Sequence, residues 1–196
     1  MRVLFLCLLV VFVYAYDEDD LMTLLDTKSC ELCDLSGADL SEQNFDRGSL
    51  IESDLSGANL SNSSFKFVDF YGADLQNVEA LGAEFYDANF ESADLSKANF
   101  KESQFKVAGF GNADLSHSNF ESTGLWGSTF SKTNVKKANF KEAYFAQALI
   151  SSVNLQEANL DDTVLWEANI TSSILTKKQC ALAKEEEAIL VKTTCK

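Results

Sequence analysis

The sequence contains no proline, and it is poor in histidine, tryptophan and basic residues. Without proline, no position marks a rigid turn or a Pro-rich linker. The chain has 16 Lys and Arg against 30 Asp and Glu, a formal net charge of −14. A field of this sign repels nucleic acid and anionic membrane surfaces, and it favours basic partners or cations.

Catalytic motifs are missing as well. The single histidine, His117, has no cysteine, serine or acidic partner implied by a motif. The sequence has no Gly-rich phosphate loop, no nucleophile elbow and no metal-ligand spacing. We therefore expect a protein that is not an enzyme and that uses no cofactor or metal.

Residues 1–15 have the pattern of a secretory signal peptide. Arg2 supplies the positive charge, residues 3–14 are apolar, and Ala15 ends a small-residue cleavage site. The apolar run is shorter than the ~20 residues that a membrane-spanning helix needs. We expect cleavage after it and export, either by secretion or into the lumen of the secretory pathway.

The cysteine count fits export. Cleavage removes Cys7 and leaves an even number of cysteines, namely Cys30, Cys33, Cys180 and Cys195. In an exported chain, an even count indicates disulfides rather than free thiols.

From residue 33 to 177 the chain divides into 29 consecutive five-residue units without a phase slip. The third residue of each unit, its centre, is Leu in 13 units and Phe in 12, so 12 of the 15 Phe share one phase. The first residue is small in every unit except that of Gln43, and it is Ala in 14 units; the second is mostly Asp or Asn. A period of five fits neither a helix nor a strand, but it fits short extended stretches joined by corners. Alternation then directs the first and third residues into a narrow tube.

A second period predicts the number of sides. Every fourth centre from Leu35 onward is aliphatic, whereas the series that begins at Phe45 is mostly Phe. Like residues therefore recur every 20 positions, which indicates four units per coil and about seven coils. At ~4.8 Å per coil the rod is roughly 35 Å long.

The Ala-(Asp/Asn)-(Leu/Phe)-x-x units, such as Ala38-Asp39-Leu40 and Ala98-Asn99-Phe100, resemble the pentapeptide-repeat family. The resemblance implies an all-β solenoid, a right-handed four-sided parallel β-helix. Residues 24–40, with Cys30-Glu31-Leu32-Cys33, resemble its exported branch, which includes thylakoid-lumen members and pairs a helical cap with a Cys-x-x-Cys motif. Residues 1–15 lack the Ser/Arg-rich character of a plastid transit peptide, which argues against a thylakoid address. A thylakoid lumen or a periplasm therefore stands behind the secretory pathway as an alternative address.

We expect a cap at each end of the solenoid, over residues 16–32 and 178–196, because open solenoid ends need cover. Residues 17–28 suit a short helix with Leu21, Leu24 and Leu25 on one face. Thr176 and Gln179 match a capping box that opens a helical tail to about residue 193.

The rod separates the cysteines into two distant pairs. Bridged Cα atoms lie within ~7 Å, so pairing across the rod is excluded and Cys30–Cys33 and Cys180–Cys195 remain. A continuous helix would hold Cys180 and Cys195 about 22 Å apart, so the tail must fold back near residues 185–187. A redox-active Cys30-x-x-Cys33 is the alternative to a structural bridge.

Three asparagines on outward positions, Asn59, Asn62 and Asn169, stand in glycosylation sequons. Two further outward sets could bind partners. One is an acidic column at the second position of the units, consisting of Asp34, Asp54, Asp74, Asp94 and Asp114. The side chains of this column either form hydrogen bonds with their own backbone in turns, or they attract cations or a basic partner. The other is an aromatic face, consisting of Phe67, Tyr86, Trp126, Tyr144 and Trp166. It is either a protein interface or a surface covered by the tail.

These features favour a rigid, acidic, exported scaffold that binds another protein through the aromatic face. Some members of the family imitate DNA and inhibit topoisomerases, so a DNA-mimicking inhibitor of a DNA-binding enzyme is the alternative, which export opposes. A structural lumenal protein without a fixed partner is a third candidate.

Overall fold

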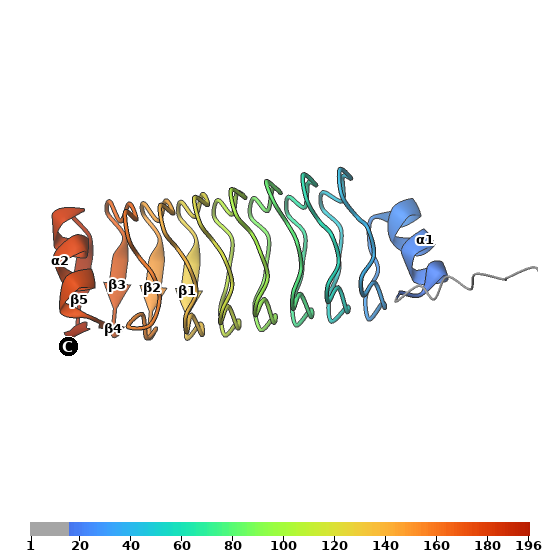
Figure 1. The fold of residues 1–196 in the computed structure, drawn as a ribbon. Helices are drawn as coiled ribbons and strands as arrows, with labels where there is room; N and C mark the ends of the chain where they lie inside the picture. The colour runs from blue at the N-terminus through green and yellow to red at the C-terminus, as the bar shows by residue number, and fades with distance from the viewer. Residues whose placement is uncertain (1–15) are drawn as a thin grey trace, which may run out of the picture.

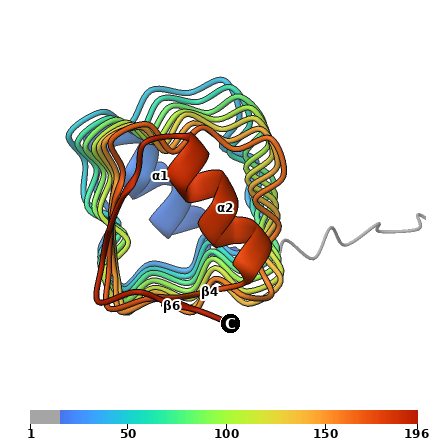
Figure 2. The ribbon, with the colours of Figure 1, turned by 90° about the vertical axis from the view of Figure 1, so that its left-hand side faces the viewer.

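The computed structural model describes residues 16–196, which form a rod of stacked coils with a helix at each end (Figure 1). The expected signal peptide, residues 1–15, lies outside the described residues. Residues 20 apart pair in parallel bridges, from Asp34 with Asp54 to Asn154 with Ile174. Seen along its axis the rod has four sides (Figure 2). The chain is thus a right-handed four-sided parallel β-helix, and the predicted fold class is confirmed.

Each corner of a coil depends on a left-handed residue at the end of a unit. The fifth residue has a positive φ in nearly all units, for example 58° at Glu42 and 59° at Asn62. Extended residues on either side keep the coil in register, because the amides of most centres donate to a carbonyl one coil on. Leu35 N, for instance, lies 2.7 Å from the carbonyl oxygen of Asp54.

The core is a column of stacked centres. No centre from Leu35 to Leu175 is more than 5% exposed. Phe45, Phe65, Phe85 and Phe105 form one stack, with successive ring centroids 5.2, 5.4 and 4.7 Å apart. Such offset stacks add to the free energy gained by burying the rings.

Buried hydroxyls fit into the same interior because they find backbone acceptors. Ser63 Oγ donates to the carbonyl of Leu40 at 2.7 Å, and Thr133 Oγ1 donates to that of Phe110 at 2.6 Å. A small polar residue can therefore replace Ala at the first position of a unit without leaving an unsatisfied group.

The N-terminal helix, α1 (Glu18–Thr27), covers the first coil. Asp17 caps it by accepting from the amides of Asp19 and Asp20. Of the three leucines expected on its inner face, Leu24 is fully buried, Leu21 is half-buried and Leu25 is 50% exposed. Leu25 therefore does not belong to the buried face.

The C-terminal segment corrects the expected helical tail. The capping box of Thr176 and Gln179 forms, but α2 (Lys177–Glu185) ends eight residues before the predicted residue 193. The chain turns at Glu187, whose φ is 60°, and rejoins the β-helix. A helix that continued to residue 193 would deprive two sides of the last coil of their backbone partners, and it would hold Cys195 away from Cys180.

The regular strands lie near this C-terminal end. β1 (Thr129–Ser131), β2 (Leu149–Ser151), β3 (Asn169–Thr171) and β5 (Ile189–Val191) form one parallel sheet in that order. β4 (Ile174–Leu175) pairs with β6 (Thr194–Cys195). Because Asn169 pairs with Ile189 and Leu175 with Cys195, the 20-residue register continues past the helix. Among residues 16–196, no helix is both long and apolar enough to cross a lipid bilayer.

Candidate partner-binding face

The aromatic face lies on one side of the rod, but its five members differ in exposure. Phe67, Tyr144 and Trp166 are exposed by 39, 43 and 41%. Tyr86 and Trp126 are half-buried. The tail leaves Trp166 open to solvent, so the interpretation of this face as a surface covered by the tail does not hold for that residue.

Cationic side chains stack on the aromatic rings of the N-terminal part of this face. The guanidinium of Arg47 lies 4.6 Å from the centroid of the Phe67 ring, and Phe67 meets Tyr86 edge to face at 5.1 Å. Lys106 Nζ lies 5.9 Å from the Tyr86 centroid and 4.8 Å from that of Trp126. Each of these contacts favours a fixed side-chain position, since a cation over a ring is attracted by its negative face.

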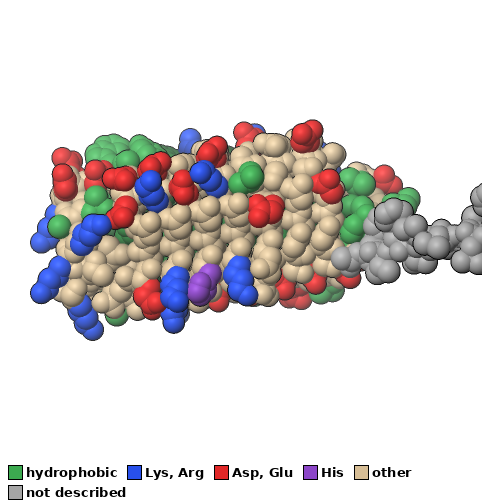
Figure 3. Space-filling model, in the orientation of Figure 1, with side chains coloured by type: hydrophobic (Ala, Val, Ile, Leu, Met, Phe, Trp, Pro, Cys, Tyr) green, Lys and Arg blue, Asp and Glu red, His purple; other side chains and the backbone are tan. Residues whose placement is uncertain are grey.

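The C-terminal part of the face is more apolar. Ala146 occupies the position between Trp126 and Trp166 in the column and is fully buried. Exposed Leu149 and half-buried Val164 lie in the same two coils as Tyr144 and Trp166. Figure 3 shows one group of hydrophobic side chains at an edge over the C-terminal coils and another at the N-terminal end, with charged side chains along both edges of the rod.

The polar residues beside the rings carry both signs of charge. Lys66 pairs with Glu84, and this hydrogen bond raises the pKa of Lys66. Desolvation by burial tends to raise the pKa of Asp46. Hydrogen bonds from Ser64 Oγ and the amide of Lys66 outweigh this effect, so the pKa of Asp46 lies below its usual value. Arg47, Lys66 and Lys106 therefore give the face mixed charge.

Sequence reasoning missed Arg47 and Lys106, although a signal for Lys106 was present. At the fourth position of the units, the column on this side reads Asp46, Lys66, Tyr86, Lys106, Trp126, Ala146 and Trp166. Reading every twentieth residue shows lysines and aromatic residues alternating, which predicts cation–ring stacking along the rod.

The acidic column serves the backbone. Each of its carboxylates accepts a hydrogen bond from the amide two residues later, as Ser36 N donates to Asp34 and Ser116 N to Asp114. The amide of Gln76 and its side chain both donate to Asp74, at 2.9 and 3.1 Å. This is the turn interpretation, and it accounts for the choice of Asp at these corners without a ligand.

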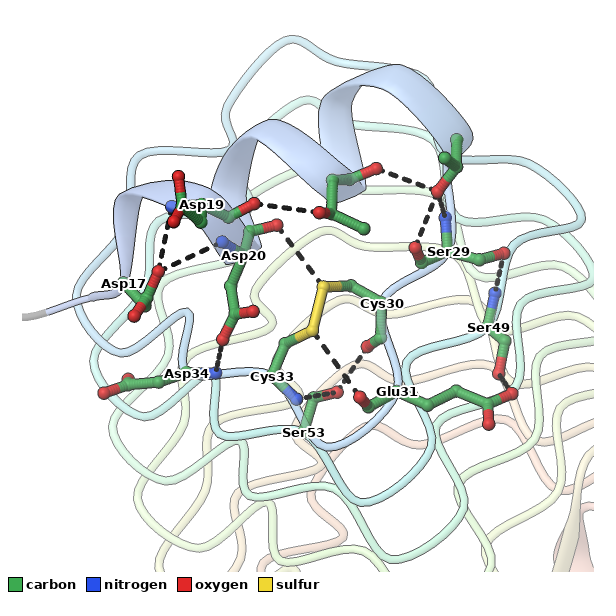
Figure 4. Close-up of a disulfide and its surroundings, with 12 residues drawn as sticks. Asp17, Asp19, Asp20, Ser29, Cys30, Glu31, Cys33, Asp34, Ser49 and Ser53 are labelled. Atoms are coloured by element: carbon green, nitrogen blue, oxygen red, sulfur yellow. Dashed lines mark hydrogen bonds between the residues drawn. A yellow bond between two sulfur atoms is a disulfide. The ribbon is translucent and has the colours of Figure 1, made fainter.

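Both cysteine pairs form disulfides, one at each end of the rod. Cys30 and Cys33, with Cα atoms 5.6 Å apart, lie beneath α1 (Figure 4). Asp20 joins this cap to the first coil, because its carboxylate accepts from the amide of Asp34 at 2.8 Å. Cys180 of α2 and Cys195 of β6, with Cα atoms 6.1 Å apart, join the C-terminal cap to the last strand.

One cluster within the described chain brings three metal-binding types of side chain together, namely Asp20, Cys30 and Cys33. Its two sulfurs are joined to each other, so they offer no thiolate to an ion. Both cysteines are also buried, which fits a structural bridge better than a redox-active one.

The three sequons differ in accessibility. Asn62 is exposed at a corner, whereas Asn59 donates to Asp39 at 3.1 Å through its side-chain amide. Asn169 lies in β3, half-buried, and its side-chain oxygen is buried without a hydrogen-bond partner among the described residues. His117 is exposed at a corner.

Two family models match the chain. The model described as pentapeptide repeats (8 copies) covers residues 33–77, and the one described as pentapeptide repeat region covers residues 83–160. The chain belongs to the pentapeptide-repeat family. Pentapeptide-repeat proteins are generally structural or binding proteins rather than enzymes. No curated protein is significantly similar to the chain in sequence.

Solved pentapeptide-repeat structures share its fold. QnrB1, a plasmid-mediated fluoroquinolone resistance protein, is 24% identical with a TM-score of 0.52, and the match covers 81% of this chain and 84% of that one. HetL, which is involved in heterocyst differentiation regulation in the cyanobacterium Nostoc sp. strain PCC 7120, is 21% identical with a TM-score of 0.50, over 92 and 95% of the chains. At this identity the likeness concerns the fold alone.

Proposed function

We propose that this pentapeptide-repeat protein is a rigid, non-enzymatic scaffold of an exported compartment that binds a partner protein through its aromatic face. The observation that carries the proposal is the exposure of Phe67, Tyr144 and Trp166 on one side of a rod whose core already holds 12 Phe. The fold needs none of these outer rings for its interior. Clustered Trp and Tyr side chains are the typical anchors of protein interfaces.

The β-helix makes such a face rigid. Each ring stands on a coil that is hydrogen-bonded to a neighbouring coil, and Arg47 and Lys106 hold the rings of Phe67 and Trp126 in place. A pre-organised surface loses little conformational entropy on association. The mixed charge of the face favours a partner whose surface also carries both signs.

The alternative, a DNA-mimicking inhibitor of a DNA-binding enzyme, draws support from the net charge of −14. A mimic would present this charge to a basic groove. The aromatic face carries Arg47, Lys66 and Lys106 instead, and the proposed signal peptide leads away from chromosomal DNA. N-terminal sequencing of the mature protein tests the export route: a chain that begins near Tyr16 supports it, and one that retains Met1 contradicts it.

The partner-binding proposal is tested by capture from the native compartment with immobilised protein. We expect wild type to retain a defined partner and a Trp166→Ala/Tyr144→Ala variant to lose it, since both side chains are exposed and contribute little to folding. Tyr71→Ala is the matched control, because Tyr71 is 42% exposed but belongs to another side of the rod. Equal retention by all three proteins would exclude the aromatic face, and retention of nothing by wild type would favour a structural protein without a fixed partner.

A further inference from the structure

The last full coil of the β-helix ends in an uncovered rim on two of its four sides. On the other two sides, β5 and β6 continue the ladder over β3 and β4. Above residues 158–167, α2 takes the place of two pentapeptide units and crosses the end of the tube diagonally instead of following the wall (Figure 2). Part of the rim is therefore left without a following strand.

Backbone donors are unpaired along this rim. One coil earlier, the amides of Phe140 and Glu142 donate to carbonyls of the rim at 2.9 Å each. The equivalent amides of Leu160 and Asp162 would need extended residues at positions 179 and 181, but both positions lie in α2. Neither amide donates a hydrogen bond to any residue between 16 and 196. Two parallel-strand donors, spaced two residues apart, remain available.

The side chain of Gln179 limits the rim at its other end. Gln179 Nε2 donates to the carbonyls of Leu155 at 2.7 Å and Ala158 at 3.0 Å. It thus replaces the backbone amide that a further coil would have supplied to Ala158. The free stretch of rim accordingly begins at Leu160.

A groove of about 640 Å³ opens between this rim and α2. Buried Ala158 and Leu160 line it on the side of the coil, and Ala181 and Leu182 on the side of the helix. Its charged lining residues are the acids Asp161, Asp162 and Glu185 and the single base Lys178. Lys178 is already paired with Asp161 at 2.6 Å, so the groove has net negative charge.

We propose that this groove binds an extended, basic peptide segment of a partner protein, which adds to the rim as one more parallel strand. Carbonyls of the peptide accept from the amides of Leu160 and Asp162, as in other cases of strand addition to an open sheet edge. Lys or Arg side chains of the segment pair with the acidic lining. A second copy of this chain would bring the same negative charge to the groove, so charge complementarity favours a different, basic partner.

The proposal goes beyond the aromatic face and is independent of it. Neither Trp126 nor Trp166 lines the groove. Loss of partner capture through Trp166→Ala/Tyr144→Ala therefore leaves the groove intact, and changes in the groove leave the aromatic face intact.

A synthetic acetylated and amidated peptide of alternating Lys and Val, six residues long, is the probe. We expect it to bind the mature chain, and at saturation to slow amide hydrogen exchange at Leu160 and Asp162 at least tenfold. The double variant Asp161→Asn/Asp162→Asn should weaken binding at least tenfold, while the control Glu91→Gln/Glu102→Gln, with the same change of charge on exposed residues elsewhere, should not. Asn also tolerates the positive φ of 58° at position 162, so the variant is expected to fold.

Three results would overturn the proposal. The first is absence of binding by the Lys/Val peptide. The second is binding that leaves exchange at Leu160 and Asp162 unchanged, because the peptide would then not be hydrogen-bonded to the rim. The third is equal protection of these amides by spermine, because charge alone would then explain the effect.

Discussion

At the scale of single residues, the corners require a left-handed backbone that some side chains adopt at a cost. Val107 has a φ of 63° although it is β-branched, and it lies on the aromatic side of the rod between Phe67 and Trp126. A β-branched residue is a rare occupant of this region, since its Cβ substituents crowd the backbone. The backbone strain at Val107 is therefore confined to this corner.

Replacing Val107 with Asn should therefore stabilise the protein. Asn visits the left-handed region readily, and we expect Val107→Asn to raise the free energy of unfolding by up to about 1 kcal/mol. Urea denaturation measures the change. The control is Glu102→Asn at a corner with the same φ of 63°, where the unbranched side chain is expected to change stability less. Equal gains at the two positions would show that branching is not the source of strain.

The acidic column offers a second test on one residue. Asp74→Ala removes the acceptor of two hydrogen bonds from Gln76 and should lower the free energy of unfolding by about 0.5–1.5 kcal/mol. Asp74→Asn keeps an acceptor for the amide of Gln76 and removes a charge from between Asp54 and Asp94. We expect it to be neutral or slightly stabilising at low salt. Denaturation that ranks Asn below Ala would contradict the turn role of this carboxylate.

At the scale of elements, the N-terminal cap depends on a glycine at an inward position. A Cβ on Gly48 would lie 1.8 Å from the carbonyl oxygen of Lys28, the residue that ends α1. At this position of the unit most other units carry a residue larger than glycine, most often Ala. Gly48 therefore marks the place where the cap packs against the first coil. The contact is with backbone, which cannot swing aside as a flexible side chain can.

Gly48→Ala should therefore displace the cap. We expect a loss of about 1–3 kcal/mol from overpacking, together with faster amide hydrogen exchange in α1. Gly109→Ala is the matched control, because the nearest atom to a Cβ there is Thr129 Oγ1 at 3.7 Å and its φ is not positive. Unchanged exchange in α1 for Gly48→Ala would show that the cap can shift without loosening.

The repeats and the caps differ in how far they could be predicted. All but two units from residue 33 to 177 carry a small inward residue and a large centre, the exceptions being those of Gln43 and Ala80, so the coil and its period follow from local sequence. The return of the tail into register does not, because Ile189 and Thr194 pair with residues 20 positions earlier and α2 interrupts the pattern between them. The disulfide between Cys180 and Cys195 predicted the fold-back but not its form.

The aromatic face was only partly predictable for a similar reason. Period 20 placed its rings on one side, but their exposure depends on the neighbouring side chains. Lys106 lies over Trp126, whereas no cation of residues 16–196 lies over Trp166, which stays 41% exposed. Whether a ring contacts solvent or a stacked cation depends on the positions of the neighbouring side chains, and a sequence pattern does not specify those positions.

At the scale of the whole molecule, one interior runs the length of the rod, and it should reject volume anywhere along it. Ala98 is 1% exposed and belongs to the inward column, so Ala98→Trp should cost about 1–3 kcal/mol or more. Lys101→Ala in the same unit loses only a partly exposed ion pair with Glu121 and should stay within about 0.5 kcal/mol of wild type. Thermal denaturation compares them, and similar losses would contradict the inward assignment.

The most direct test of the proposed function uses the two tryptophans as reporters. Trp126 and Trp166 are the only tryptophans in the chain, and both belong to the aromatic face. Protein labelled with 5-fluorotryptophan therefore gives ¹⁹F NMR signals from that face alone. On addition of the captured partner, we predict that the signal of exposed Trp166 shifts and broadens, with a smaller change at half-buried Trp126. Saturation with the partner, established separately by calorimetry, that leaves both signals unchanged would contradict the account.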